Sequence, residues 1–418
     1  MELNLQEIIE SDCQSPIGFQ PSVDVETTEW NNNMYNQSIC FYIHIPFCEQ
    51  KCSFCGLFSK VDYTTQKLHQ YTDAIIREIK QYSNKILINK KIEAIHFGGG
   101  TPSLLDVEDI NRIIQAIYKY CDVSILKEIV LESNPASLNE EKILQYEKID
   151  KIKLNMGIQS FDSVCLETIK RKSDQDHIKQ VILQALNSKI NSVGIDLIYG
   201  LPNSSLESCL NDVKNAVCLG IDYITLYPLW IEKNTILEKQ NKKHNDNNWI
   251  NYNNRKEMLV QMSNILLENG YLQLSSYHWS KKGLPNYIYS QRQMEGNSWL
   301  GIGAGAVSYL DGLSFNNTYD IDSYIKEPFE ENYIIEKVQL LDFDNRLARD
   351  VAYGLRLMPF KLEVLRAKYG KHALDYMYNL MKNLERSGFL IFSDNEIRLS
   401  YDGILSLNYI EKYIMEKK

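Results

Sequence analysis

The stretch around which this chain is organised is residues 41–58, FYIHIPFCEQKCSFCGLF. An apolar, strand-like run opens it, and Cys48, Cys52 and Cys55 follow at CxxxCxxC spacing. A short loop with this spacing can bring three thiolates to one metal centre. Four cysteines would complete the protein ligands of a four-iron, four-sulfur cube, so three leave one iron open. An open iron can be chelated by the amino and carboxylate groups of S-adenosylmethionine (SAM), which one electron then splits to a 5′-deoxyadenosyl radical.

A structural zinc site is the alternative for the same cysteines. Zinc in such a site takes four ligands, commonly from two CxxC-like pairs. The nearest further candidate is His44, which lies on the run before the loop, where alternation favours a packed or supporting position. The sequence therefore favours an iron–sulfur cluster over zinc.

Length and composition bound the remaining possibilities. With 418 residues, 44% of them hydrophobic, the chain can bury one large core and a smaller one. The net charge of −9 argues against nucleic acid and against an anionic membrane surface as partners. The other cysteines are scattered, no apolar run has the length of a membrane span, and the N-terminus does not resemble a signal peptide. We expect a cytoplasmic protein with reduced thiols.

From residue 40 onward, short β-rich runs alternate with amphipathic helical stretches, which is typical of repeated βα units. The expected strands are 40–45, 93–97, 127–132, 153–158, 193–198 and 223–228, and the expected helices include 65–83, 105–119, 174–188 and 204–219. Six units predict an α/β fold of the partial (β/α)6 TIM-like barrel type. Ligands should gather at the carboxyl ends of its strands.

Polar and glycine residues stand where those strands end. Gly98, Gly99 and Gly100 follow the second strand, and Glu132 ends the third; each could equally be a tight turn or a surface cap. Asp196 lies inside the apolar fifth strand and needs a partner or a wet cavity. Arg171 is the partner we expect, and the pair could be purely structural.

These motifs resemble the radical SAM family typified by oxygen-independent coproporphyrinogen III oxidase, from about residue 40 to the C-terminus. The resemblance rests on the YIHIPFC opening of the loop, the aromatic residue before its last cysteine and the glycine turn one βα unit later. It implies a [4Fe-4S] cluster and up to two SAM molecules, with an electron donor such as flavodoxin or ferredoxin. The positions that match the cluster-bound SAM are Tyr42, Gly99 and Glu132, and those that match a second SAM are Phe54, Gly100, Thr101, Gln159, Arg171 and Asp196.

Five further features bear on the reaction. The run YPLW at 227–230 resembles the class C radical SAM methyltransferases of this family, and its Trp230 would either reshape the second SAM pocket or pack in the core. Val307, in a GxGxGA run, matches a contact to adenine. The HNxxYW-type motif of haem-chaperone members is replaced here by YSQRQM at 289–294, and the additional cysteine of the oxidase is Leu57. Tyr277 and His278 end a late strand and could contact a flat, unsaturated substrate.

The rest of the chain predicts accessory parts. We expect an N-terminal arm at 1–38, the catalytic barrel with its extension at 39–326, a solvated loop near 233–253 and a linker at 327–344. Residues 345–418 predict helices at 346–357, 361–369 and 372–388 and then a β-hairpin, as in a winged-helix-like domain that serves either as a substrate lid or as a packing domain.

Three functions remain open. The first hypothesis is methylation or cyclopropanation of an sp² carbon in a small molecule, with the second SAM as methyl donor. The second is radical chemistry on a tetrapyrrole, either oxidative decarboxylation of coproporphyrinogen or attack on haem. The third is a haem carrier of the chaperone type without catalysis. The absent HNxxYW motif counts against the third, and Leu57 against the oxidase form of the second.

Overall fold

The structure is a computed structural model that describes residues 38–171, 174–243, 251–329, 334–394 and 396–417. The N-terminal arm expected at 1–38 lies outside these residues except for its last position. The Asn-rich run at 244–250 also lies outside the described residues.

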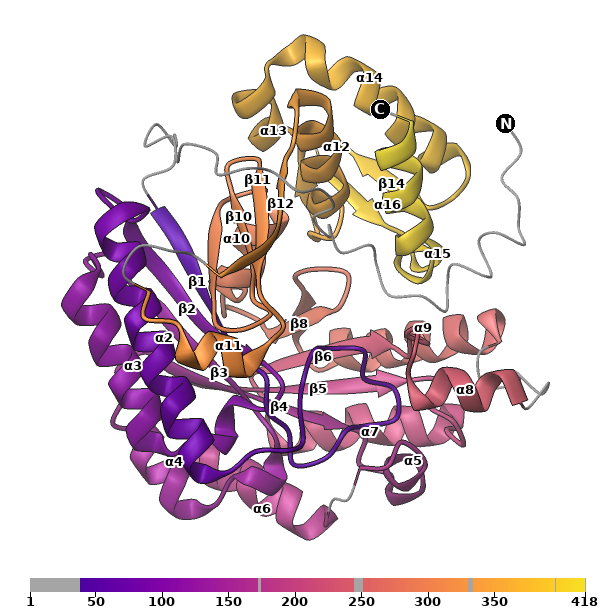
Figure 1. The fold of residues 1–418 in the computed structure, drawn as a ribbon. Helices are drawn as coiled ribbons and strands as arrows, with labels where there is room; N and C mark the ends of the chain where they lie inside the picture. Colours follow the sequence, from indigo (N-terminus) through magenta and orange to yellow (C-terminus); the bar gives the residue numbers. More distant parts are fainter. Residues whose placement is uncertain (1–37, 172–173, 244–250, 330–333, 395, 418) are drawn as a thin grey trace.

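Six parallel strands form the centre of the fold, as the sequence predicts (Figure 1). They are β1 (Ser38–Ile45), β2 (Lys91–Gly99), β3 (Glu128–Ser133), β4 (Ile152–Gln159), β5 (Ser192–Tyr199) and β6 (Tyr223–Pro228). They pair in sequence order, each with the next in parallel register. The parallel strands read as almost continuous apolar runs because both faces of the sheet are covered; in β3, for example, Ile129, Val130 and Leu131 are all fully buried.

Helices cover the outer face of these strands (Figure 1). They are α2 (Thr65–Lys85), α3 (Val107–Tyr120), α4 (Glu140–Tyr146), α5 (Ser163–Thr168), α6 (Gln175–Leu186) and α7 (Leu206–Leu219), with short 3-10 turns at Pro102–Leu104 and Pro135–Ser137. Local sequence sets their ends. Ser205 and Ser208 form a reciprocal capping box at the start of α7, and Gly220 ends that helix at φ 77°.

The sheet continues beyond the six units. The sequence predicted one late strand here, ending at Tyr277 and His278; the structure has two short antiparallel strands in its place. The other additional strands were not predicted. It has twelve strands in the order β12-β11-β10-β9-β1-β2-β3-β4-β5-β6-β8-β7. The additional elements are α8 (Ile236–Lys243), α9 (Tyr252–Glu268), β7 (Tyr271–Gln273), β8 (His278–Lys281), α10 (Ile288–Met294), β9 (Trp299–Ile302), β10 (Val307–Leu310), β11 (Leu313–Asn317), α11 (Ile321–Lys326) and β12 (Ile335–Leu340). Helix α8 occupies part of the segment expected as a loop. Strand β12 lies within the segment expected as a linker and pairs with β11.

The C-terminal part contains three helices followed by a β-hairpin, in the expected order. Its elements are α12 (Phe343–Gly354), β13 (Phe360–Lys361), α13 (Leu362–Tyr369), α14 (Lys371–Arg386), β14 (Leu390–Ser393), β15 (Glu396–Leu399), α15 (Tyr401–Leu405) and α16 (Leu407–Glu416). The three short strands form a separate sheet in the order β13-β15-β14. The expected α/β fold, a partial barrel with a smaller helical C-terminal part, is thus confirmed.

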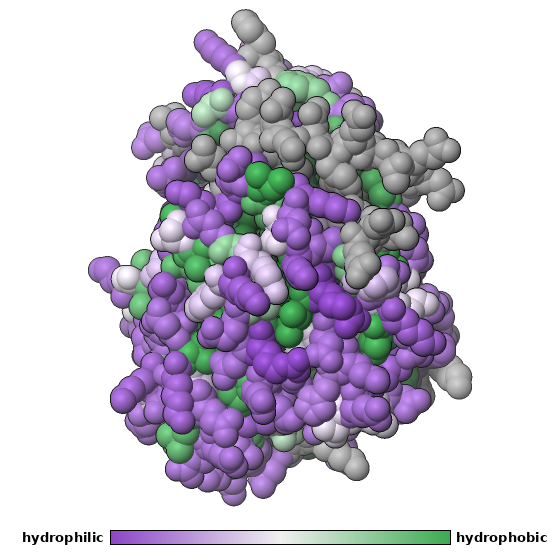
Figure 2. Space-filling model, turned by 60° about the vertical axis from the view of Figure 1, so that its left-hand side comes forward, coloured by the Kyte–Doolittle hydropathy of each residue, from purple (hydrophilic) through white to green (hydrophobic). Residues whose placement is uncertain are grey.

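The visible surface is mostly hydrophilic with small apolar areas between (Figure 2). Within the described ranges, no helix combines the length and apolar character needed to cross a bilayer.

Candidate functional site

The cysteine loop leaves the end of β1 and is held at several points by backbone hydrogen bonds. The amide of Cys48 donates to the carbonyl of Lys60 at 3.0 Å, and the amide of Lys60 donates to Pro46 at 2.8 Å. In the middle of the loop, Ser53 donates to the carbonyl of Ile169 at 3.0 Å. The loop therefore has a fixed path across the carboxyl ends of the strands, where the sequence places the site.

The three thiols form a donor set that fits an iron–sulfur cube. They are half-buried and free of disulfides. Thr101 donates its hydroxyl to the sulfur of Cys48 at 3.7 Å, and Arg171 donates from Nη1 to the sulfur of Cys52 at 3.8 Å. Burial raises the pKa of the Cys55 thiol, and the neighbouring Cys52 and Cys48 raise it further. A cationic donor and a hydroxyl donor at the sulfurs suit thiolates that carry negative charge.

A single-ion site is less well supported by the same geometry. Zinc binds sulfur at about 2.3 Å, so thiolates on one ion must approach within about 4 Å of each other. Among the described residues, no three Cys, His, Asp or Glu side chains are close enough to hold one ion. In a four-iron cube each cysteine binds a different iron atom, so the three cysteine sulfurs lie further apart than they do on one zinc ion.

The glycine turn after β2 packs directly on the start of the cysteine loop. The amide of Gly100 donates to the carbonyl of Ile45 at 2.9 Å, and the amide of Thr101 donates to that of Phe47 at 2.7 Å. A Cβ atom on Gly100 would lie 2.5 Å from the Phe47 carbonyl oxygen. Gly99 has φ +110°, and a Cβ there would lie 2.6 Å from the His44 ring. The glycines are therefore required by close packing between the two segments.

His44 has the supporting role that its place on the strand predicts. It is buried, with Nδ1 3.2 Å from the Tyr42 hydroxyl and Nε2 3.2 Å from the carbonyl oxygen of Phe58. Burial lowers the pKa of His44 to about 4, so its ring is neutral at pH 7. It thus orients Tyr42 beside the loop.

The polar residues at the other strand ends are paired differently from our expectation. Asp196 accepts a hydrogen bond from Asn155 Nδ2 at 3.0 Å, whereas Arg171 donates to the carbonyl of Gly157 and to Asn134 Oδ1 at 3.1 Å. The expected Arg171–Asp196 pair is therefore wrong. Arg171 follows α5 and reaches the cysteine loop, while Asp196 points to the barrel interior next to Asn155 of the adjacent strand.

Gln159 shows local backbone strain at the end of β4. Its φ is +75°, and the pairing with β5 is interrupted by a bulge between Gly157 and Gln159. A left-handed conformation in a residue other than glycine costs about 1–2 kcal/mol and clusters at functional sites. The strain is consistent with the ligand-binding role predicted for this residue.

The barrel encloses a cavity of about 460 Å³ at its centre. Four predicted site residues, Tyr42, Glu132, Asp196 and Trp230, lie in its wall, as do Tyr277 and His278. The full lining is Tyr42, His96, Val130, Glu132, Asn155, Asp196, Thr225, Tyr227, Trp230, Tyr277, His278, Tyr287, Tyr289, Ser290, Gln293, Met294 and Arg356.

The remaining predicted residues lie elsewhere in the described structure. Thr101 and Arg171 contact the cysteine sulfurs. The carbonyl of Val307, on β10, accepts a hydrogen bond from the Trp299 indole at 3.0 Å. Phe54 packs on the main hydrophobic core. None of these contacts tests a role in binding SAM, so the SAM-binding assignments stay predictions.

Several lining residues carry a buried polar atom without a hydrogen-bond partner among the described residues. These atoms are His96 Nδ1, Asn155 Oδ1, His278 Nδ1 and the Tyr287 hydroxyl. Burial lowers the pKa of His278 to about 4, which keeps its ring neutral. Buried polar groups are nearly always satisfied, so these four atoms are exceptions in the wall of the cavity. The sequence indicated His278 as the end of a late strand, whereas it begins β8. The sequence carried no signal for the other three.

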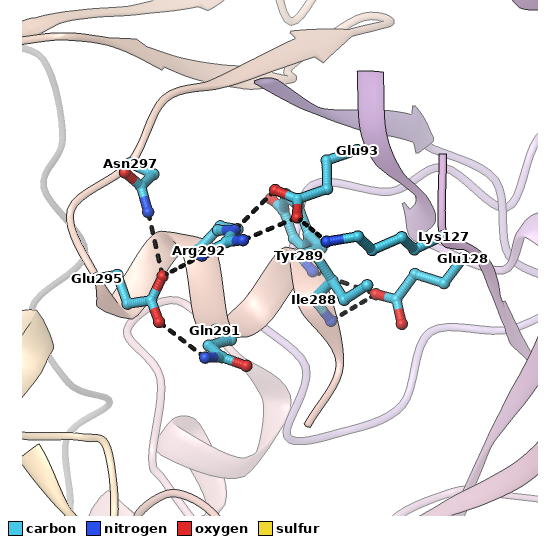
Figure 3. A network of polar contacts seen from close by, with 9 residues as sticks. All are labelled: Glu93, Lys127, Glu128, Ile288, Tyr289, Gln291, Arg292, Glu295 and Asn297. Atoms are coloured by element: carbon cyan, nitrogen blue, oxygen red, sulfur yellow. Dashed lines mark hydrogen bonds and ion pairs between the residues drawn. The ribbon is translucent and has the colours of Figure 1, made fainter. Parts of the chain in front are cut away.

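Helix α10 closes one side of the cavity and is clamped by two glutamates (Figure 3). Glu93 binds Arg292 through two hydrogen bonds of 2.7 Å. Glu128 accepts the amides of Ile288 and Tyr289, at 2.6 and 3.2 Å, at the start of the helix. The hydrogen bonds from Arg292 lower the pKa of Glu93 to about 2. The clamp fixes Tyr289 against the cavity.

A pH-dependent contribution to stability follows from Asp196. Burial raises its pKa from 3.8 to about 6, so the folded state holds a proton that the unfolded state loses, and this stabilisation declines as the pH rises from about 4 to 6. We expect Asp196→Asn to be more stable than the unsubstituted protein by about 3 kcal/mol at pH 7 and close to it near pH 4. Urea unfolding at both pH values measures this difference. A difference that is the same at pH 4 and pH 7 would show that Asp196 is not the titrating group.

The comparisons with known proteins agree with the geometry. The Radical SAM superfamily model matches residues 42–215. "Heme chaperone HemW" of Lactococcus lactis is 28% identical over 390 residues, which cover 90% of this chain and 97% of that protein. "Heme chaperone HemW" of Buchnera aphidicola from Acyrthosiphon pisum is 32% identical over 275 residues, which cover 64% of this chain and 69% of that protein.

A solved structure shares the whole fold. Coproporphyrinogen III oxidase of Escherichia coli, described as a radical SAM enzyme, aligns with a TM-score of 0.76 at 21% identity, covering 99% of this chain and 93% of that one. The cysteine loop, the parallel strands and these relatives lead to one conclusion: the chain belongs to the radical SAM family of oxygen-independent coproporphyrinogen III oxidase and its HemW relatives.

Proposed function

We propose that this chain binds a [4Fe-4S] cluster through Cys48, Cys52 and Cys55, holds SAM beside it, and acts on a tetrapyrrole in the barrel cavity. When bound, the cluster and SAM supply a 5′-deoxyadenosyl radical by reductive cleavage. An external donor such as flavodoxin or ferredoxin would provide the electron. The names of the relatives, which concern haem and coproporphyrinogen, support a tetrapyrrole over the methylation substrate that we first expected.

The observation that carries the proposal is the aromatic wall of the cavity. Tyr227, Trp230 and Tyr277 contact one another with ring centroids 5.3–5.5 Å apart. On another part of the wall, Tyr42 and Tyr289 stack at 5.7 Å. Flat aromatic side chains provide apolar contact area for a flat, unsaturated ligand, and they exclude water from a reactive radical.

The polar residues of the wall would orient such a ligand. Glu132, near the end of β3, has Oε1 2.9 Å from His96 Nε2, and the resemblance predicts that this side chain contacts the cluster-bound SAM. Asn155, His278 and Tyr287 add further polar side chains to the cavity wall. The site therefore offers an aromatic enclosure with polar side chains in its wall. Tyr42 connects it, through His44, to the cysteine loop at Phe58.

Methyl transfer from a second SAM is the second candidate. It is favoured by the presence of Asp196 and Trp230 in the same cavity wall. Asp196 matches a second-SAM position, and Trp230 belongs to the YPLW run that resembles class C methyltransferases.

One experiment separates the candidates. Anaerobically reconstituted protein is incubated with haem, a reductant and SAM deuterated in its methyl group. We expect stoichiometric haem binding, 5′-deoxyadenosine formation and loss of the haem absorption. Haem that binds without being consumed would identify a carrier, and deuterium in an added acceptor would identify methyl transfer. No binding of haem or of a porphyrinogen would overturn the proposal.

A further inference from the structure

Arg356 belongs to the C-terminal part of the chain but lies in the wall of the barrel cavity. The backbone of its segment is fixed to the segment before β8. Ser276 donates its amide to the carbonyl of Arg356 at 2.7 Å, and Met358 donates to the carbonyl of Leu274 at 3.0 Å. The C-terminal part thus completes the site with a side chain of its own.

The guanidinium group is oriented but not saturated. Its Nε donates to Glu411 Oε1 at 2.6 Å, and the group lies 4.3 Å from the centre of the Tyr353 ring. Among the residues that the structure describes, Glu411 is the sole hydrogen-bond partner of this side chain. Arginine carries five N–H donors, so the terminal nitrogens remain for another acceptor. The Arg356 side chain is 20% exposed, compared with 2% for Glu411, which is consistent with its opening to the cavity.

The charges of the cavity favour an anion at this point. Arg356 is the only lysine or arginine among the described lining residues, and the two carboxylates of the wall are Glu132 and Asp196. A carboxylate on a ligand would be repelled near those two side chains and attracted to Arg356. Trp230 packs on Tyr277 with ring centroids 5.5 Å apart, and Arg356 lines the same cavity, so one ligand can present an apolar body and an anionic edge to them.

We propose that Arg356 binds a carboxylate group on the edge of the ligand, so that the C-terminal part orients the ligand in the barrel. The inference rests on the proposed function for the identity of the ligand. The carboxylate could come from a propionate of a tetrapyrrole or from the methionyl end of a second SAM, and the geometry supports the shared chemistry. A fork of N–H donors matches a carboxylate better than a lysine would.

The test compares haem with its dimethyl ester, which lacks free carboxylates. The full-length reconstituted protein should bind haem at least about tenfold more tightly than the ester, the value of one charge-assisted contact. Arg356→Gln should lose this preference. Glu411→Gln should keep or increase it, because the guanidinium is no longer neutralised. Arg398→Gln, which removes an exposed arginine of β15, is the matched control and should change nothing.

The opposite behaviour of two variants distinguishes binding from a structural ion pair. If Arg356 only fastened α16, both Arg356→Gln and Glu411→Gln would lower stability and weaken haem and its ester equally, which would overturn the inference. In the other supporting outcome, Arg356→Gln no longer binds a second equivalent of SAM, while its binding of decarboxylated SAM is unchanged. This result would show that Arg356 binds the carboxylate of SAM.

A second readout does not depend on tetrapyrrole binding. Iodide quenches an accessible tryptophan and, as an anion, concentrates near a free guanidinium. The fluorescence of Trp230, obtained as the difference from Trp230→Phe, should be quenched by iodide about twofold less in Arg356→Gln, with quenching by neutral acrylamide unchanged. If the unsubstituted protein binds no tetrapyrrole, the proposed function is wrong, but the quenching measurement still tests whether Arg356 forms an anion site. Equal iodide quenching would contradict the anion site.

Discussion

Alanine at Cys48, Cys52 or Cys55 is expected to abolish cluster binding and reductive cleavage of SAM. In the proposed site each thiolate would supply one of three protein bonds to the cube, and the loop offers no fourth cysteine to compensate. Iron and sulfide should fall from about four of each per chain to near zero, and 5′-deoxyadenosine formation should fall at least about a thousandfold, which corresponds to about 4 kcal/mol in the barrier.

Cys218→Ala is the matched control, because Cys218 is exposed on α7 and outside the loop. It should retain full iron content and activity. Far-ultraviolet circular dichroism of each variant should be unchanged, since strand β1 and the helices do not require the cluster for their backbone pairing. The assignment of the ligands would be wrong if any of the three loop variants kept its full iron content.

Gly100→Ala is expected to destabilise the protein by about 3 kcal/mol and to impair cluster assembly. Its Cβ would lie 2.5–2.9 Å from the backbone atoms Phe47 O, Phe47 N and Ile45 O. Backbone atoms cannot rotate away, so the glycine turn and the start of the cysteine loop must separate. Denaturant unfolding of the apo protein and iron content after reconstitution measure the two effects.

Gly283→Ala is the control that separates the cost of a steric clash from the cost of a left-handed backbone conformation. Gly283 has φ +97° and nothing within 4 Å of a Cβ, so only the cost of a left-handed residue, about 1 kcal/mol, is expected, with normal iron content. Equal destabilisation of both variants would show that the contact between the glycine turn and the loop has no special role.

The local parts of the site could be predicted from the sequence because they are encoded by local patterns. The cysteine loop after β1, the glycine turn after β2 and Glu132 at the end of β3 follow from alternation of apolar runs with helices. The carboxyl ends of parallel strands meet at one edge, so these residues were expected to converge.

Features that depend on distant contacts could not be predicted. Strand β9 pairs with β1, although about 260 residues separate them, and no composition signal specifies that pairing. The prediction that Arg171 pairs with Asp196 was wrong. Arg171 lies in a connection after α5, and the direction of the strands does not determine which side of the barrel wall such a residue contacts. Arg356 enters the cavity through the docking of the C-terminal part, and only the structure reveals it.

The central claim is that three thiolates hold a cluster whose fourth iron binds SAM. The most direct test is electron paramagnetic resonance of the reduced cluster with SAM labelled with ¹⁵N in its amino group. The account predicts a changed spectrum and hyperfine coupling to the label. An unchanged spectrum without coupling, or reconstituted protein that holds zinc in place of iron, would contradict it.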